Sequence, residues 1–393
     1  MRQSHARTHV AGGLHCDYIR GMRIRLSLWA YLVPIISLAL TIVVLIVPMG
    51  LTLALISTVA LIGAVIAAVH HAEVIAHRVG EPYGTLVLSI SITIIEVALI
   101  LTIMLSEGPE KATLARDTIF SVIMITCNGL VGLSLLIGAL RHHEQAFHVV
   151  GSNASLATLI ALTTLSLVLP MFTTSSPGPT YTTSQLAFAA IASLLLWGTF
   201  VFVQAVRHRD YFLAVGDATD VVGHATDAVG ATGEEAHAPP PSAKRALASF
   251  GMLLMSLVAV VGLADLLSPK IESAVVEAGA PKEILSIIIA MLTLLPECWA
   301  AVRAALADRL QTSLNLALGS ALASIGLTIP TIAFSSVLLG TTMILGLAPK
   351  ELALLVLTFL VSSVTLVAGR THMLLGVVHL VIFGAFVFFA LVP

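Results

Sequence analysis

Two glutamates lie inside long apolar segments of the chain. Glu96 is the one charged residue of segment 84–105, and Glu297 lies in segment 284–306, where the other charge is Arg303 near the end. A charged side chain at the centre of a bilayer costs about 2.5–3.5 kcal/mol on insertion scales, and such residues typically mark a path for ions or protons. We therefore predict that Glu96 and Glu297 form a shared cation/proton-binding site.

Small polar residues accompany each glutamate at helical spacing. Ser89 and Thr93 precede Glu96 by seven and three residues, and Thr293 precedes Glu297 by four, so each set shares one helical face. Helix packing through small residues is the alternative explanation for the serines and the glycine, but it requires no carboxylate. The predicted supporting ligands or pore-lining residues are Ser89, Thr93, Asn128, Thr293, Gly319, Ser320 and Ser324.

Other polar residues in apolar surroundings are weaker candidates. His379 lies alone in the last apolar segment, where we predict a hydrogen-bonded packing residue, and Asp117 falls at the end of a predicted span. The three cysteines are scattered and form neither a disulfide nor a zinc pattern. There is no P-loop and no nucleophile elbow, so we predict a transporter and not an enzyme, with no cofactor other than the transported ions.

The composition is that of a membrane protein. Of the 393 residues, 58% are hydrophobic and 10% are charged, and the mean hydropathy is +1.03. The net charge of −2 gives no basic field for nucleic acid. Apolar runs near 20 residues predict eleven membrane spans, at about 28–47, 51–69, 83–105, 117–140, 154–172, 184–206, 247–267, 283–306, 312–338, 350–368 and 373–391.

The order of the spans predicts an inverted repeat. The first half crosses the membrane five times, which is an odd number, so the second half enters the membrane from the opposite side. Such inverted repeats are common in secondary transporters. We expect an all-α polytopic fold with an N-terminal helix and two inverted five-helix repeats. Lys and Arg concentrate on the side of the N-terminus, which predicts a cytoplasmic N-terminus in the cell inner membrane. The predicted parts are a tail (1–25), an anchor helix (26–47), a first repeat (48–206), an acidic cytoplasmic linker (207–246) and a second repeat (247–393).

The residues around the glutamates resemble the calcium:cation antiporter superfamily. Segment 285–331 is similar to its second α-repeat, with Glu297 in mid-helix, a charged turn at Asp308-Arg309, then Gly319-Ser320 and Pro330. Segment 80–140, with GEPYGTL and an Arg-Asp-Thr turn, is similar to the first repeat, with Glu96 as its acid. Together with LLPE and an acidic, histidine-containing loop, these motifs most resemble the bacterial calcium/proton branch, to which sodium and potassium exchange for protons is also credited.

The resemblance implies a secondary active antiporter that works by alternating access. We expect export of Ca²⁺, or of Na⁺ or K⁺, in exchange for protons. Many relatives carry Gly-Asn-Ala before each glutamate, where this chain has Thr93-Ile94-Ile95 and Leu294-Leu295-Pro296, so the amide ligands are absent and a monovalent site is favoured more than in those relatives. A monovalent antiporter without significant Ca²⁺ transport is therefore the first alternative.

Two other classes of protein are more distant alternatives. An intramembrane lipid-modifying enzyme would use a glutamate as general base, but no nucleophile or metal cluster accompanies either one. A membrane scaffold would not need matched polar faces in both halves. The expected partners are small cations, protons and the lipid bilayer, and an oligomer is left open.

Overall fold

The computed structural model describes residues 28–79, 90–91, 93–98, 100–101, 113–213, 241–277, 279, 281, 283–340 and 343–392. The predicted N-terminal tail, most of the acidic linker and the candidate Ser89 lie outside the described residues. Within the described part the chain is almost entirely helical, as the apolar runs predict.

Nine described helices are long and apolar enough to cross a membrane, and α10 makes a tenth if its two bent parts form one span. The predicted span 83–105 is described only in part, where residues 90–91, 93–98 and 100–101 are helical. The elements are a first span Leu28–Ile46, α2 (Leu51–Val79), α4 (Leu114–Met124), η2 (Ile125–Leu130), α5 (Val131–His142), β1 (Gln145–Ala146), α6 (Val149–Thr163), η3 (Thr164–Val168), η4 (Leu169–Met171), α7 (Thr183–Phe202), η5 (Val203–Arg207), η6 (Arg209–Phe212), α9 (Ala243–Glu277), α10 (Glu283–Leu306), α11 (Leu310–Leu339), α12 (Pro349–Val367), β2 (Arg370–Thr371) and α13 (Met373–Leu391).

Helix ends follow local sequence signals. Thr182 and Gln185 form a capping box at the start of α7, and Pro349 opens α12, where the Glu351 carboxylate accepts the backbone N–H of Ala348 at 2.8 Å. Gly340 ends α11 in the left-handed conformation, with φ of 65°. α2 and α9 run on past the predicted ends at 69 and 267, because polar residues there continue the helix beyond the apolar run.

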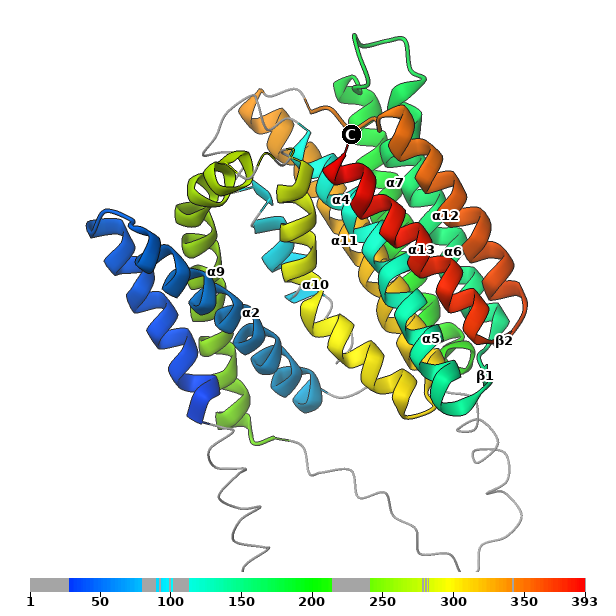
Figure 1. The fold of residues 1–393 in the computed structure, drawn as a ribbon, viewed down its shortest axis with the longest axis horizontal. Coiled ribbons are helices and arrows are strands. Elements are labelled where there is room, and N and C mark those ends of the chain that lie inside the picture. Colours follow the sequence, from blue (N-terminus) through cyan, green and yellow to red (C-terminus); the bar gives the residue numbers. More distant parts are fainter. Residues whose placement is uncertain are drawn as a thin grey trace, which may run out of the picture.

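The helices form two groups, with α10 between them (Figure 1). The first span, α2 and α9 pack together around Leu61, Ala64 and Leu263, and a Cβ atom at Gly262 of α9 would meet Thr41 of the first span at 2.6 Å. The second group is the larger bundle of α4 to α7 and α11 to α13, which holds the main core. α10 contacts members of both groups.

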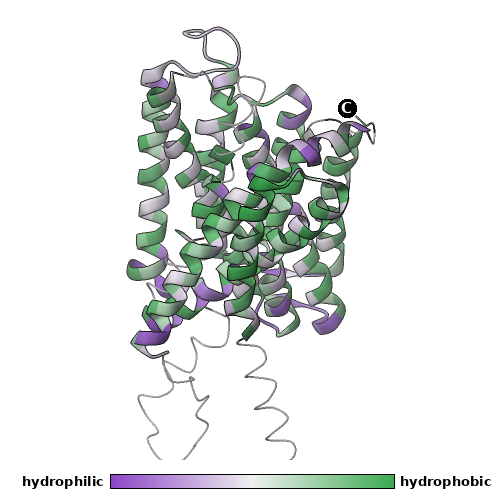
Figure 2. Ribbon diagram, turned by 90° about the vertical axis from the view of Figure 1, so that its left-hand side faces the viewer, coloured by the Kyte–Doolittle hydropathy of each residue, from purple (hydrophilic) through white to green (hydrophobic). Residues whose placement is uncertain are grey.

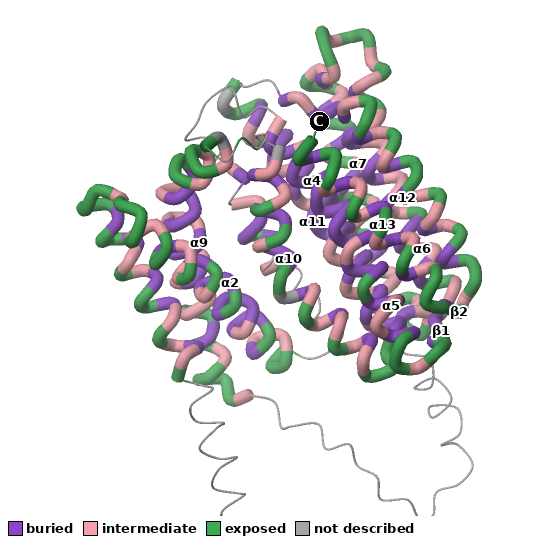
Figure 3. The backbone as a smooth tube through the Cα atoms, in the orientation of Figure 1, coloured by how far each residue is buried: buried purple, intermediate pink, exposed green. Residues whose placement is uncertain are grey.

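The outer surface of the helices is apolar. Figure 2 shows hydrophobic residues along the middle of the helices and hydrophilic residues toward their ends, and Figure 3 shows exposed residues on the outward faces. Large apolar side chains such as Leu51, Phe334 and Leu195 are 68–80% exposed. A water-soluble protein would not leave so much apolar surface uncovered, so these faces contact lipid.

A short strand pair ties the two halves together at one end of the bundle. β1 follows α5 and pairs antiparallel with β2, which connects α12 to α13. Gln145 of β1 also donates to the Asp308 carboxylate at 2.8 Å, in the turn between α10 and α11. The end of the bundle that carries β1 and β2 is called the β end below.

Candidate cation site

The two glutamates come from the two halves of the chain and lie close together. Glu96 is on the helical residues 93–98 and Glu297 is on α10, and their side chains are 4% and 6% exposed. The carboxylates are close enough to interact electrostatically. The structure thus brings together two acidic groups that are 201 residues apart in sequence (297 minus 96).

Ser324 of α11 is hydrogen-bonded to Glu96. Its hydroxyl donates a hydrogen bond of 2.6 Å to Glu96 Oε1, across the boundary between the halves. Ser324 is 1% exposed, and it lies on the face of α11 that also carries Ser320 and Ser313 at helical spacing. A hydrogen bond from a hydroxyl to an ionised carboxylate is stronger than one between two neutral groups. This bond therefore fixes the orientation of the Glu96 side chain.

Glu297 is less completely satisfied. Its carboxylate receives a hydrogen bond from Ser320, one turn before Ser324 on α11. Its Oε2 atom is buried and has no hydrogen-bond partner among the described residues. A buried carboxylate oxygen without a partner costs free energy unless something binds it. A bound cation or proton would satisfy this atom.

The remaining candidates differ in their placement. Thr293 is buried one turn before Glu297, and its hydroxyl donates to the carbonyls of Ile289 and Ala290, which leaves its oxygen lone pairs as acceptors. Thr93 is buried on the segment of Glu96. Gly319 has open space where a Cβ would stand, so a small residue is not required there by packing.

α10 is bent at the site. Its parts Ile284–Leu295 and Glu297–Leu306 differ in direction by 54°. Pro296 lies at the junction in the sequence, and a proline inside a helix removes one backbone hydrogen bond and frees a carbonyl. The bend lies where the mid-span proline is expected to free a main-chain carbonyl beside Glu297.

Asn128 belongs to a separate cluster. Its amide nitrogen donates to Thr358 Oγ1 at 2.9 Å, and its Oδ1 lies 3.1 Å from Nδ1 of His379. His379 Nε2 lies 3.1 Å from Thr365 Oγ1. These four residues are each 0% exposed. The structure thus places the predicted ligand Asn128 in a hydrogen-bonded network with α12 and α13, called the Asn128 network below.

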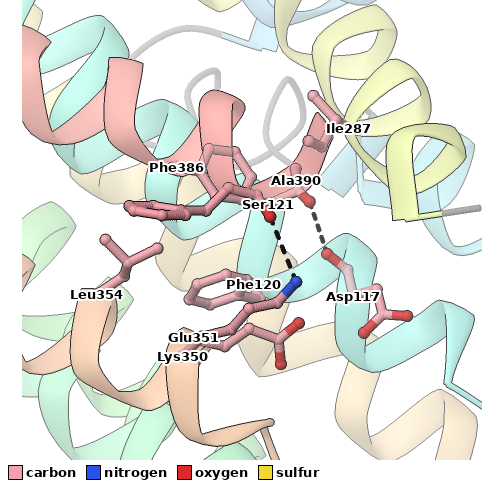
Figure 4. A pocket seen from close by; sticks show the side chains of 10 residues that line it. Asp117, Phe120, Ser121, Ile287, Lys350, Glu351, Leu354, Phe386 and Ala390 are labelled. Carbon is pink, nitrogen blue, oxygen red and sulfur yellow. Dashed lines mark hydrogen bonds between the residues drawn. The ribbon is translucent and has the colours of Figure 1, made fainter. Parts of the chain in front are cut away.

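Asp117 occupies the opposite end of the bundle from the strands. It lines a small cavity of about 30 Å³ between the ends of α4, α12 and α13, together with Ser121, Lys350 and Glu351 (Figure 4). Its carboxylate is bound by Arg116, with Oδ1 at 2.6 Å from Nη2. Arg116 also donates to the Gly346 carbonyl at 3.0 Å. Asp117 is therefore held in an ion pair at a span end.

The donor atoms around the two glutamates are oxygens, the kind of ligand that hard cations prefer. The two carboxylates, the hydroxyls of Ser320, Ser324 and Thr293, and a freed carbonyl are all oxygen ligands, which Ca²⁺ and other hard cations prefer. Among the described residues no group of three His, Cys, Asp or Glu side chains is placed to hold a metal ion. The donor set therefore rests on two acids and neutral oxygens.

The partners of His379 could not be predicted from the sequence. The histidine is hydrogen-bonded and buried, as predicted, but its link to Asn128 joins residues 251 positions apart. Asparagine and histidine are both uncommon in membrane spans, and that rarity is the signal that could have suggested a pair. The tight crossing of α5 and α13 that brings them together is not visible in either segment alone.

Comparisons with known proteins agree with this architecture. The chain matches the sodium/calcium exchanger protein family over residues 49–206 and 248–392. It is 44% identical to the putative ionic transporter y4hA of Sinorhizobium fredii over 93% of this chain and 96% of that one. It is 32% identical to the sodium-potassium/proton antiporter ChaA of Escherichia coli over 86% and 88% of the two chains.

A solved structure shares the fold. The structure of native YfkE superposes with a TM-score of 0.68 at 17% identity, and covers 93% of this chain and 100% of that chain. The resemblance inferred from the glutamate motifs is thereby confirmed at the level of family and fold class, and the members of this family are transporters. The chain is a multi-span integral membrane protein that belongs to the sodium/calcium exchanger family.

Proposed function

We propose that this protein is a cation/proton antiporter in which Glu96 and Glu297 form one shared site. The observation that carries the proposal is the 2.6 Å hydrogen bond from Ser324 to Glu96, because it assembles the site from both halves of the chain. Alternating access requires a site at such a junction, since each half can then move relative to the other while the ligands stay in place.

The burial of both acids supports coupling between the two ions. Two desolvated carboxylates that repel each other favour neutral, protonated forms, so protons compete with the cation for the same oxygens. An ionised, empty pair is costly to carry past an apolar barrier, whereas a pair neutralised by a cation or by protons is not. The site therefore changes sides only when it is occupied, and this condition produces exchange.

Ca²⁺ is the first candidate for the transported cation. Two carboxylates balance a divalent charge, and Ca²⁺ takes six to eight oxygen ligands, which the hydroxyls, a freed carbonyl and water would complete. Charge balance then calls for about two protons per Ca²⁺.

Na⁺ or K⁺ is the second candidate. The neutral ligands near the acids are hydroxyls from Ser320 and Ser324, and the amide of Asn128 is engaged with Thr358 and His379. A relative with 32% identity is named a sodium-potassium/proton antiporter. The small number of neutral ligands beside the acids makes the site less favourable for Ca²⁺, which takes six to eight oxygens, and the name of the relative supports a monovalent cation independently.

The proposed location is the inner membrane, with the N-terminus cytoplasmic. Basic residues gather at the β end: Arg370 lies in β2, Arg141 precedes β1, and Arg309 lies in the turn between α10 and α11. Lys and Arg concentrate on the cytoplasmic side of membrane proteins, so this end faces the cytoplasm. The acidic linker would lie on the same side.

The experiment is cation-driven proton movement in liposomes that contain the purified protein and a pH-sensitive dye. Ca²⁺, Na⁺ and K⁺ gradients are applied in parallel to wild type, Glu96→Gln and Glu297→Gln. Glu144→Gln makes the same chemical change on an exposed carboxylate near β1 and is the matched control. We expect exchange in wild type and in the control, and at least a 100-fold loss in both site variants. Near wild-type exchange in either site variant would overturn the proposal.

A further inference from the structure

The Asn128 network has a single consistent arrangement of donors and acceptors. Thr358 donates its hydroxyl hydrogen to the Leu354 carbonyl at 2.7 Å, so it can only accept from Asn128, and the amide nitrogen must face it. The amide oxygen then faces His379. Because that oxygen only accepts, Nδ1 of His379 carries the hydrogen, and Nε2 accepts from Thr365. Neutral His379 therefore fixes the orientation of the Asn128 amide.

The network is built on an irregular turn. Asn128 lies in η2, a π-helical turn that interrupts the helix formed by α4 and α5. Such turns occur frequently at functional sites, because they leave backbone groups outside the regular ladder. The imidazole of His379 also reaches the backbone carbonyl of Cys127, the residue before Asn128 in this turn. His379 thus holds both a side chain and the backbone of η2.

Close helix packing brings His379 to this turn. A Cβ atom at Gly132 would lie 2.8 Å from the Cβ of His379, and one at Gly376 would lie 2.6 Å from the backbone nitrogen of Leu136. Glycines at both positions therefore let α5 and α13 approach closely.

The same turn packs against the two helices that carry Glu297 and the serine hydroxyls of the carboxylate site. η2 packs against α10, which carries Glu297, and against α11, which carries Ser320 and Ser324. α5 is tied to α11 directly, since Ser313 donates to Ser134 at 2.8 Å. A change in the shape of η2 would therefore shift the two helices that supply the cation ligands.

We propose that His379 is a positioning residue for the cation site, acting through its hydrogen bond to Asn128. This inference rests on the proposed antiport function. In the described part of the chain, His379 bonds to Thr365 and Asn128 and to neither glutamate. It holds the Asn128 amide and the π-helical turn in the shape that keeps α10 and α11 at the right separation for binding. Loss of the hydrogen bond between His379 and Asn128 should raise the half-saturating cation concentration more than it lowers the maximal rate of exchange.

Two substitutions separate the two bonds of His379. In His379→Asn the shorter amide places a donor near the position of Nδ1, so the bond to Asn128 is kept and the bond to Thr365 is lost. In His379→Gln the longer amide reaches the position of Nε2, so the bond to Thr365 is kept and the bond to Asn128 is lost. Thr365→Val removes the Thr365 bond from the other side and is the matched control.

The measurement is the half-saturating cation concentration and the maximal rate of proton exchange in liposomes, with the unfolding temperature of each purified variant. We expect His379→Gln to raise the half-saturating concentration about three- to tenfold, the range of single interhelical hydrogen bonds, with little change in maximal rate. His379→Asn and Thr365→Val should stay within about twofold of wild type.

The outcomes are separable. Equal half-saturating concentrations in His379→Asn, His379→Gln and wild type would overturn the inference and leave His379 a purely structural residue. Where His379→Gln is not recovered folded, Asn128→Thr takes its place, because it removes the same bond from the other partner and predicts the same rise; an unchanged value there also overturns the inference. If wild type itself shows no exchange, the proposed function is wrong, and this result is distinct from any difference among the variants.

Discussion

The carboxylate site and the Asn128 network are neighbouring polar clusters that differ in how completely their buried polar atoms are hydrogen-bonded. In the network, Asn128 and His379 use their polar side-chain atoms in hydrogen bonds within the protein. At the carboxylate site, Oε2 of Glu297 is buried without a partner among the described residues. The difference indicates different roles. A completed network holds helices in place, whereas an incomplete one costs stability and is retained where an ion binds.

Removing the charged group from the carboxylate site should have the largest effect. Glu297→Leu should reduce exchange at least 100-fold, because the site loses half its charge. It should not lower the unfolding temperature, since a buried acid with an unpartnered oxygen is replaced by an apolar side chain. Exchange assays and thermal unfolding of the same preparation check both. A clear drop in unfolding temperature would show that Glu297 is structural.

The corresponding change in the network should have the opposite sign for stability. Asn128→Leu removes hydrogen bonds to Thr358 and His379, each about 0.6–2 kcal/mol between membrane helices, and leaves His379 Nδ1 buried without the amide acceptor, which adds a desolvation cost of about 1–3 kcal/mol. We expect a loss of about 2–4 kcal/mol, seen as a lower unfolding temperature in detergent. An unchanged unfolding temperature would mean that the network does not hold the helices together.

Removing a hydroxyl from the carboxylate site should affect binding more than folding. Ser324→Ala deletes the hydrogen bond to Glu96, and bonds to charged groups contribute about 1.5–3 kcal/mol. The half-saturating cation concentration should rise about tenfold or more, measured by cation-driven proton movement. Ser335→Ala, on the same helix with its hydroxyl bonded to the Thr331 carbonyl, is the control and should behave as wild type. Equal values for the two variants would remove Ser324 from the site.

The smallest of these effects concerns the helix crossing beneath the network. Gly376→Ala would place a methyl group 2.6 Å from the backbone of Leu136, and overpacking of this kind costs about 1–3 kcal/mol. Gly384 lies on the same helix with open space around it, so Gly384→Ala should be neutral. Thermal unfolding of the two variants compares them directly. Similar stability would show that α5 and α13 can separate without loss.

Much of the site could be predicted from sequence because charges are rare inside membrane spans. Glu96, Glu297 and the hydroxyls around them stand out against apolar segments, and helical spacing places Ser320 and Ser324 on one face. The bond between Ser324 and Glu96 could not be predicted, since periodicity describes one helix and not the distance to another. The irregular turn at Asn128 also has no sequence signal of its own, since its contacts with α12 and α13 join segments more than 200 residues away.

The fold was predictable for a related reason. Apolar length alone indicates membrane spans, so α10 and α13 begin and end at the predicted residues. α2 and α9 are longer than predicted because both helices continue past their apolar runs into polar residues, and a hydropathy pattern does not detect helix there. The separation of α2 and α9 from the main bundle could not be predicted. It depends on which apolar faces pack together, and every span has an apolar face.

The central claim is that cation and protons share the oxygens of Glu96 and Glu297. The direct measurement is proton release when Ca²⁺, Na⁺ or K⁺ is added to purified protein in weakly buffered detergent solution. Wild type is expected to release protons on binding the cation that it transports, and the Glu96→Gln, Glu297→Gln double variant is expected to release none. Undiminished release from the double variant would show that the exchanging protons bind elsewhere than on these two carboxylates.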